Sequence, residues 1–315
     1  MIYPRLLTRL VAAAALALCA APLLVGAQVR TPRPSPKASV MQTVGVTDVT
    51  ITYSRPGVKG RRIWGDPPAG AAAGAATLDD ARARPKDAAI VPFGHVWRTG
   101  ANEATTFTVT DDVLVNGQPL KAGTYSLHTI PGPSEWTIIF NSDPGQWGSF
   151  QYDEKKDVLR VKARPQPSAD SQEWLGFSID PAGETSARVV LRWEKLTVPF
   201  TVEVPDVKGL TVAKLRTAVA SAKADDWQTP LQAANHLLQS NLGLPQALVW
   251  AEQSIKAREN FQNLSLKARI LAAQGKTAEA VAAGEKALQT GRANNANAQA
   301  LANFEQTLAD WRGKQ

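Results

Sequence analysis

The spacing of apolar residues changes once along this chain of 315 residues, and that change limits the folds open to it. From Ser39 to about Val204, short runs alternate apolar and polar residues and are rich in Val, Ile, Thr and aromatics, among them "DVTITYS", "TTFTVT" and "ARVVLRW". A period of two is typical of half-buried β-strands. From Thr211 onward, apolar residues recur every three to four positions, as on one face of an α-helix. The sequence therefore predicts an all-β domain followed by a small all-α domain.

The alternating part predicts a β-sandwich, which we place at residues 28–204. Its strand-like runs are short and evenly spaced, with turn residues between them, as in sandwiches and barrels. Between two of these runs the chain reads "VNGQPLKAG". Asn116 and Gly117 there predict a hairpin turn, because both residues tolerate positive φ.

The helical part, residues 211–315, contains an internal repeat. Its length is 33 residues, close to the ~34-residue period of tetratricopeptide repeats. The segment "LSLKARILAAQGKTAEAVAAGEKAL" resembles that family, although the proline usual at the end of a unit is absent. Two roles stay open here: a structural bundle docked on the β-domain, or a surface for a peptide or protein partner. The repeating positions are Leu231, Leu238, Ala247, Leu248, Ala251 and Ile255, then Leu264, Leu271, Ala280, Val281, Gly284 and Leu288.

Local signals predict where some of these helices begin and end. The segment Thr229–Gln232 has the form of a capping box with proline at the first helical position. Gly243 and Gly275 stand where helices are expected to end.

Residues 1–27 have the order of a secretory signal peptide. Arg5 and Arg9 precede an apolar run that ends in small residues, so we expect cleavage after Ala27. Retention as a membrane anchor is the alternative, which Pro22 and the alanine content of the run disfavour. We therefore expect a periplasmic or secreted protein with no membrane span in its mature form.

The composition of the mature chain excludes some chemistry. The single cysteine, Cys19, lies in the signal peptide, so thiol catalysis, disulfides and cysteine metal sites are excluded. The formal net charge of +7 falls to +5 without Arg5 and Arg9, and the cations are scattered. We expect no nucleic-acid partner from this pattern.

One stretch of the β-domain breaks its pattern. Residues 66–89, from Asp66 to Ala89, are dominated by Pro, Gly and Ala and show no apolar period. Such a segment buries too little apolar surface to fold, so we expect a disordered insertion.

Long motifs of the β-domain resemble the DUF2911 family, exported bacterial proteins of unknown function. They are "SPKASVMQTVGVTDVTITYSRPGVKGRRIWG", "VPFGHVWRTGANEATTF", "AGTYSLHTIPG", "EWTIIFN" and "YDEKKDVLRVKA", within about Ser35 to Ala163. A tetratricopeptide-like tail also occurs in longer members, whereas members usually pass almost directly from "IWG" to "VPFG", without the insertion. The resemblance implies no activity. Its motifs hold eight candidate binding residues: Arg55, Lys59, Arg61, Trp64, Trp97, Arg98, Asn102 and Glu103.

Two of these motifs suggest binding chemistry. In "SRPGVKGRR", Gly57 and Gly60 allow backbone N–H groups to converge while Lys59 and Arg61 supply charge, as a carboxylate or phosphate site requires. The alternative is a solvated basic turn.

The segment "VWRTGANEATTF" has the densest polar side chains beside an aromatic one. We predict that Arg98 pairs with Glu103, with Trp97 beneath them and Asn102 or Gly100 in the left-handed region. On one interpretation these side chains form hydrogen bonds with buried backbone groups at the point where a strand begins. On the other they form a polar pocket with a tryptophan wall, suited to a sugar or peptide.

Catalytic and metal motifs are weak. The histidines are His95, His128 and His236, with no pair at i, i+4, no "GxSxG" turn and no phosphate-binding loop. A dispersed Ser-His-Asp site stays open, although His128 alternates within a strand, which favours a structural role. We expect no cofactor and no metal.

The function that these patterns favour is non-catalytic binding of a small molecule, glycan or peptide, with the helical tail mediating assembly. A hydrolase of envelope or extracellular polymers is the alternative, with Glu103 as general acid or base and Arg98 holding an anionic group. A structural scaffold is the third possibility.

Overall fold

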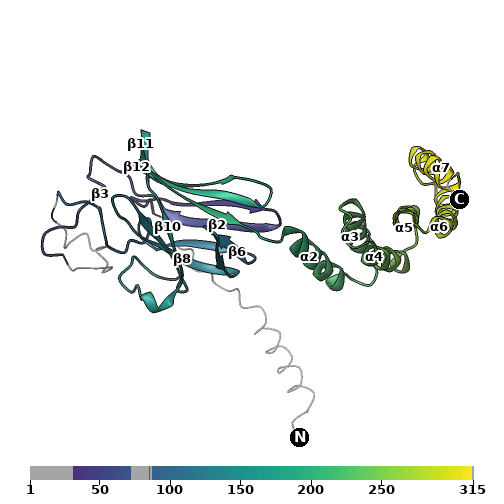
Figure 1. Cartoon of the computed structure of the whole chain (residues 1–315), viewed down its shortest axis with the longest axis horizontal. Helices are drawn as coiled ribbons and strands as arrows, with labels where there is room; N and C mark the ends of the chain where they lie inside the picture. Colours follow the sequence, from purple (N-terminus) through teal and green to yellow (C-terminus); the bar gives the residue numbers. More distant parts are fainter. Residues whose placement is uncertain (1–30, 72–84, 86, 314–315) are drawn as a thin grey trace, which may run out of the picture.

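The computed structural model describes residues 31–71, 85 and 87–313 (Figure 1). Two predictions fall on other residues and so lie outside the described part: the signal peptide at 1–27 and the centre of the insertion, 72–84 and 86. Ala89, the last residue of the predicted insertion, is described and buried. The packed part of the domain therefore resumes before Ile90.

Two antiparallel sheets form the β-domain. The larger follows the order β1-β2-β5-β8-β9-β10 and the smaller the order β11-β12-β6-β7, while β3 and β4 form a short parallel pair. Strands of the larger sheet are β1 (Lys37–Val44), β2 (Thr47–Ser54), β5 (Thr105–Val109), β8 (Gly123–Ile130), β9 (Trp136–Asn141) and β10 (Asp157–Ala163). The others are β3 (Trp64–Gly65), β4 (Val91–Pro92), β6 (Val113–Val115), β7 (Gln118–Leu120), β11 (Gln166–Pro181) and β12 (Ser186–Glu203).

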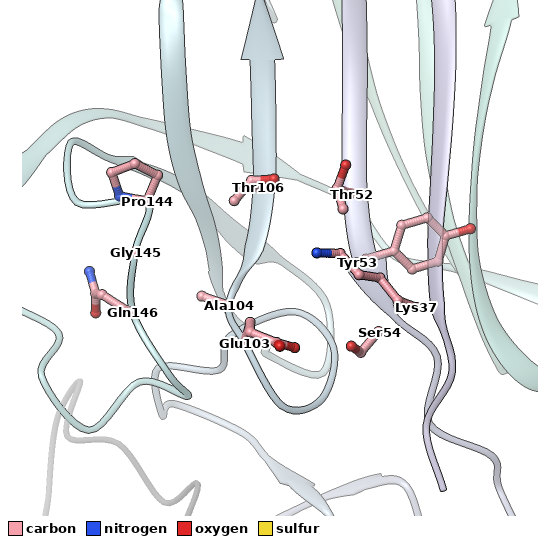
Figure 2. Close-up of a pocket in the computed structure, with 10 residues that line it drawn as sticks. All are labelled: Lys37, Thr52, Tyr53, Ser54, Glu103, Ala104, Thr106, Pro144, Gly145 and Gln146. Atoms are coloured by element: carbon pink, nitrogen blue, oxygen red, sulfur yellow. The ribbon is translucent and has the colours of Figure 1, made fainter. Parts of the chain in front are cut away.

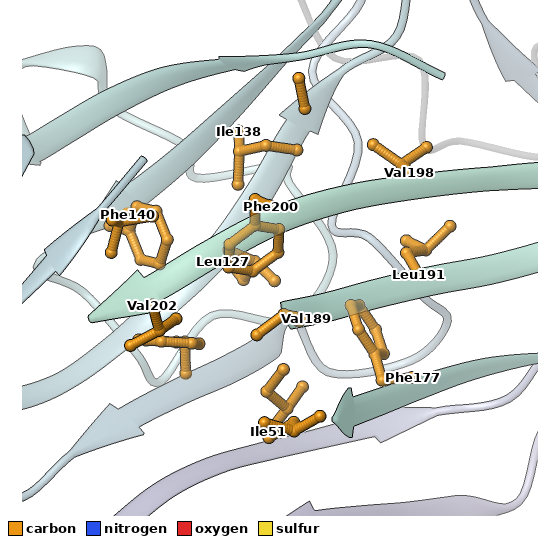
Figure 3. Packing of buried hydrophobic residues seen from close by; sticks show 14 of the residues in the cluster. Ile51, Leu127, Ile138, Phe140, Phe177, Val189, Leu191, Val198, Phe200 and Val202 are labelled. Carbon is orange, nitrogen blue, oxygen red and sulfur yellow. The ribbon is translucent and has the colours of Figure 1, made fainter. Parts of the chain in front are cut away.

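The predicted β-sandwich is confirmed, and alternation explains its core. Ile51 and Leu127 point inward from the larger sheet, and Val189 and Phe200 meet them from β12 (Figure 3). The hairpin prediction is also confirmed, because Asn116 (φ 46°) and Gly117 (φ 78°) join β6 to β7.

The helical region predicted after the sandwich is confirmed, and the described residues form six helices there. They are α2 (Val207–Ser221), α3 (Gln228–Gln239), α4 (Leu244–Ala257), α5 (Phe261–Ala273), α6 (Thr277–Ala293) and α7 (Ala298–Arg312). Helix α5 begins 33 residues after α3, and α6 begins 33 residues after α4, in agreement with the sequence repeat. Figure 1 shows the helices as an arm that leads away from the sandwich.

Two predicted helix ends are wrong. Helix α3 begins at Gln228, before Thr229, because the Asp226 carboxylate accepts the backbone N–H groups of both residues. Gly243 (φ 76°) is the residue before α4 and does not end α3. Gly275 (φ 77°) does follow the end of α5, as predicted.

Helix α2 connects the two regions. Val207 and Leu210, in its first turn, pack against the sandwich core, and Lys214 forms an ion pair of 2.8 Å with Asp111. Val219, near its end, belongs to the core of the following helices. The helix therefore contacts both regions, with its first half on the sandwich.

Candidate functional site

The polar segment from Val96 to Phe107 lies at one end of the larger sheet and runs into β5 at Thr105. Asn102 adopts the left-handed region (φ 59°), as predicted for it, and so does Thr99 (φ 56°). Trp97 Nε1 donates to the Gly100 carbonyl at 3.1 Å, and Thr105 Oγ1 donates to the Thr99 carbonyl at 2.9 Å. These bonds hold a tight loop in place, with Glu103 just before the strand.

Glu103 has a different ion-pair partner from the one predicted. Its Oε1 atom accepts a hydrogen bond from Arg33 Nη1 at 2.7 Å, whereas we expected Arg98. Arg98 instead lies beside the loop between β9 and β10, where its Nη1 atom is 3.0 Å from a Cβ built on Gly148. The predicted Arg98–Glu103 pair is therefore wrong: the loop directs the two side chains to different neighbours.

A groove of about 180 Å³ opens beside Glu103 (Figure 2). Its floor is the outer face of β2 and β5, and one wall is the β9–β10 loop. Backbone bonds hold this wall against the polar segment, from Ala104 N to the Gln146 carbonyl at 2.9 Å and from Gly148 N to the Asn102 carbonyl at 3.0 Å. The lining residues are Lys37, Thr52, Tyr53, Ser54, Glu103, Ala104, Thr106, Pro144, Gly145 and Gln146.

A row of polar side chains crosses the outer face of the larger sheet through this groove. Each member is the cross-strand partner of the next, and the last pair, Asn141 and Asp157, lies beside a register shift between Asp157 and Leu159 of β10. The row therefore presents hydroxyl, amide and carboxylate groups side by side. From β1 to β10 its members are Ser39, Thr52, Thr106, Ser126, Asn141 and Asp157.

The groove carries both signs of charge. Burial raises the pKa of Glu103, but hydrogen bonding and attraction from Arg33, together with a backbone hydrogen bond and the charge of Lys37, outweigh burial and leave this pKa below its usual value. Glu103 is therefore ionised at neutral pH. Its Oε2 atom is buried and has no hydrogen-bond partner among the described residues.

A buried hydrogen-bond network supports the wall of the groove. Gln146 Nε2 donates to Asn141 Oδ1 at 3.2 Å, and Asn141 Nδ2 donates to Asp157 Oδ1 at 2.8 Å. Tyr152 Oη and Arg160 Nε both donate to Asp157 Oδ2, at 2.6 and 2.7 Å. The network ties the loop to β9 and β10, which makes the wall rigid.

His128 lies inside the domain, beside this network. Its Nδ1 atom is 3.2 Å from Ser149 Oγ, and both residues are fully buried. Burial lowers the pKa of His128 to about 4, against the opposing charges of Asp157 and Asp143. The imidazole is neutral at neutral pH, and a substrate cannot reach the Ser149 hydroxyl, which disfavours a nucleophilic site here.

The tryptophans of the predicted aromatic wall are part of the core. Trp97 stacks on Trp193 with ring centroids 5.9 Å apart, and Trp64 meets Trp97, Trp136 and Trp193 edge-on at 5.1–5.7 Å. Trp97 is buried and Trp64 half-buried. They cannot stack on a ligand at Glu103, because they already pack on each other.

The basic turn holds a carboxylate, but one from the chain itself. Glu173 Oε1 accepts the Lys59 backbone N–H at 2.9 Å, in the place where we predicted a ligand anion. Arg61 donates to the carbonyls of Gly57 and Val58, at 2.6 and 3.2 Å, and so stabilises the turn. The candidate residues are thus divided: Glu103 lines the groove, and Lys59 and Arg61 lie at a separate turn.

Sequence reasoning missed most of the groove. Lys37, Thr52, Thr106 and Gln146 come from four distant segments, and alternating threonines in "TITYS" and "TTFTVT" are the only local signal. Within the described part of the chain, no group of three or more potential ligands has the arrangement of a metal site. No described helix is both long and apolar enough to cross a membrane.

Comparison with known proteins identifies a family. The model of a family described as "Protein of unknown function (DUF2911)" matches residues 35–202, which span the sandwich and most of β12. No curated protein and no solved structure matches the chain.

Proposed function

This chain belongs to the DUF2911 family of proteins of unknown function, and since membership supplies no activity, we propose that the groove at Glu103 binds a small ligand rich in hydroxyl groups, such as one sugar residue of a glycan. The observation that carries the proposal is the partly exposed, ionised Glu103 carboxylate beside Lys37 and the threonine hydroxyls in one groove.

The lining chemistry supports a hydroxylated ligand. A sugar hydroxyl both donates and accepts hydrogen bonds, so it can donate to Glu103 while accepting from Lys37, Thr52 or Thr106. Hydrogen bonds to charged groups are the stronger ones, which gives the Glu103 and Lys37 contacts the largest share of the affinity. Drug-sized ligands occupy pockets of about 300–1,000 Å³, so a groove of about 180 Å³ fits a single residue or the end of a longer chain.

Binding accounts for these features better than hydrolysis. A general acid needs a raised pKa so that it is protonated at neutral pH, whereas the pKa of Glu103 is lowered. Glycoside hydrolysis commonly needs a second carboxylate across the scissile bond, and Glu103 is the only carboxylate among the described residues that line the groove.

The test is a glycan array followed by calorimetric titration of the best hit with the full mature chain. Glu103→Gln removes the anionic acceptor, and we expect at least tenfold weaker binding. It should keep the fold: the Glu103 and Arg33 side chains are 40% and 49% exposed, and such surface pairs contribute about 1 kcal/mol or less.

Two threonines of β5 provide a matched comparison. Thr106 lines the groove, and Thr108 lies on the same face of the strand, outside it. Thr106→Val should weaken binding and Thr108→Val should leave it unchanged. Equal affinities for the two variants would contradict the proposed site.

Export and assembly complete the proposed function. We propose that the chain is exported after cleavage at Ala27, which an intact mass of the native protein beginning at Gln28 would support. We further propose that α3–α7 mediate assembly with a partner, since they project from the sandwich and pack in cores of their own. Light scattering of the full chain and of a chain ending at Lys223 should then differ in complex size.

A further inference from the structure

A second cleft, of about 500 Å³, lies along β11, at the edge of the smaller sheet. It opens mainly on the outer face of β11 and β12, because Gly176, Ser178 and Asp180 line it while Leu175 and Ile179, which alternate with them, point into the core. The lining is strongly polar and includes two arginines: the residues are Tyr53, Arg55, Gln172, Gly176, Phe177, Ser178, Asp180, Val190 and Arg192.

Two side chains from β2 and the residue after it bond to the free edge of β11. Arg55 Nε donates to the Leu175 carbonyl at 2.7 Å, and the Phe177 backbone N–H donates to Tyr53 Oη at 3.1 Å. The bond from Nε fixes the orientation of the Arg55 guanidinium, and the two terminal nitrogens of that group are left available to a ligand in the cleft. The Tyr53 hydroxyl accepts that N–H and so keeps its own hydrogen available for donation.

Gly176 leaves room for the Gln172 amide in the middle of the cleft, beside the Arg55 guanidinium. A Cβ built on Gly176 would lie 3.8 Å from Arg55 Nη2 and 2.7 Å from Gln172 Nε2. Arg192 is the cross-strand partner of Gly176 on β12. Two guanidinium groups and an amide therefore line the cleft around one glycine.

Neither arginine has a carboxylate partner within the described part of the chain. Like charges in one cleft repel each other, and an anion that binds both guanidinium groups relieves that repulsion. At the other end, Ser178 Oγ donates to Asp180 Oδ2 at 2.8 Å, which leaves carboxylate oxygen for a ligand donor.

We propose that this cleft binds the oxyanion group of a hydroxylated organic anion, such as a sugar phosphate or a uronate. Arg55 and Arg192 hold the phosphate or carboxylate oxygens, Tyr53 donates a further hydrogen bond, and Asp180 accepts from a ligand hydroxyl. The site is separate from the groove at Glu103 and does not depend on the function proposed there.

The experiment is calorimetric titration of the full mature chain at fixed ionic strength with inorganic phosphate, glucose 6-phosphate, glucuronate and neutral glucose. We expect one or more of the anions to bind and glucose to give no heat from this cleft. Stronger binding of glucose 6-phosphate than of glucuronate would identify a phosphate ligand, and the reverse order a carboxylate.

Variants at two exposed arginines of β12 decide whether the cleft is responsible. Arg192→Met should weaken anion binding at least tenfold, and Arg192→Lys, which keeps the charge but loses the planar fork, should weaken it less. Arg188→Met removes the same charge four residues away on the same strand, outside the lining, and should change affinity less than twofold. Anion binding that is absent, that survives Arg192→Met, or that falls equally in both methionine variants would overturn the proposal.

Discussion

The sandwich and the helical region bury their apolar residues in different ways. In the sandwich, one continuous core joins residues far apart in sequence, such as Trp64 and Trp193. The helices form two smaller clusters, one around Leu237 and Ile270 and the next around Phe304 and Leu308. A core change in the sandwich should therefore affect the whole domain, whereas one in the helices should affect only neighbouring helices.

The two regions also differ in their buried polar groups. In the helical region, buried Asn263 and Ser254 bond to each other and to backbone carbonyls. In the sandwich, Glu103, Ser126, His128 and Gln146 each keep a buried polar atom without a partner among the described residues. Such groups cost stability, so their concentration near the groove supports the binding that we propose there.

The largest expected effect is in the sandwich core. Trp193→Ala removes a fully buried ring that stacks on Trp97 and should lower the free energy of unfolding by about 3–5 kcal/mol. Denaturation followed by circular dichroism should show a loss in the β-transition, with the helical signal unchanged. Trp147→Ala, at a ring that is 57% exposed, is the control, and a cost as large as that of Trp193→Ala would argue against the assigned core.

A matching change in the helices should act locally. Leu308 of α7 is buried against α6, where Gly284 leaves room for it, and Leu308→Ala should cost about 2–5 kcal/mol. Hydrogen exchange should accelerate in α6 and α7 and stay slow in α3 and α4. Acceleration throughout the six helices would break the comparison, because it would mean a single cooperative unit.

Lowering the pH should reduce the stability of the sandwich in particular, because His128 is buried there. Because burial lowers its pKa to about 4 in the folded protein, the unfolded chain binds more protons between about pH 6.5 and 4. Stability of the sandwich should therefore be full above pH 6.5 and fall as the pH is lowered towards 4, by on the order of 3 kcal/mol.

A variant checks this assignment. His128→Gln should flatten the pH dependence above pH 4.5, and His236→Gln, at an exposed histidine of α3, should leave it as in the parent. A parent whose unfolding free energy is constant from pH 6.5 to 4.5 would show that His128 does not carry the effect.

The smallest effects concern ion pairs. Arg312 and Glu285 lie 2.7 Å apart on the helical surface with side chains 53% and 54% exposed, so Arg312→Met should cost less than about 1 kcal/mol. Lys214 pairs with Asp111, which is only 15% exposed and also accepts from Thr47 and Thr110. Lys214→Met should therefore lower the free energy of unfolding more than Arg312→Met does and should loosen α2 from the sandwich, which faster proteolysis near Lys208 would report. Equal losses of stability for the two variants would mean that the ion pair does not stabilise the contact between α2 and the sandwich.

Local pattern determined the outline of the molecule. Alternation in "DVTITYS" and "TTFTVT" places Ile51 and Phe107 in a core whatever the strand order, since the side-chain period of a strand is two. The repeat of 33 residues determines the helix pairs in the same way, and Asn116-Gly117 determines its own turn. Each of these features depends on residues close together along the chain.

Tertiary structure alone decided the site. Glu103 reaches Arg33 across 70 positions, Gly57 and Lys59 meet the Glu173 segment, and Thr52 and Thr106 become neighbours only when β2 pairs with β5. Trp97 and Trp64 look like ligand platforms in sequence because exposed and buried tryptophans have the same local pattern; sheet packing buries them against Trp193. Charges and rings choose partners by proximity in the folded chain, and the register of strands distant in sequence sets that proximity.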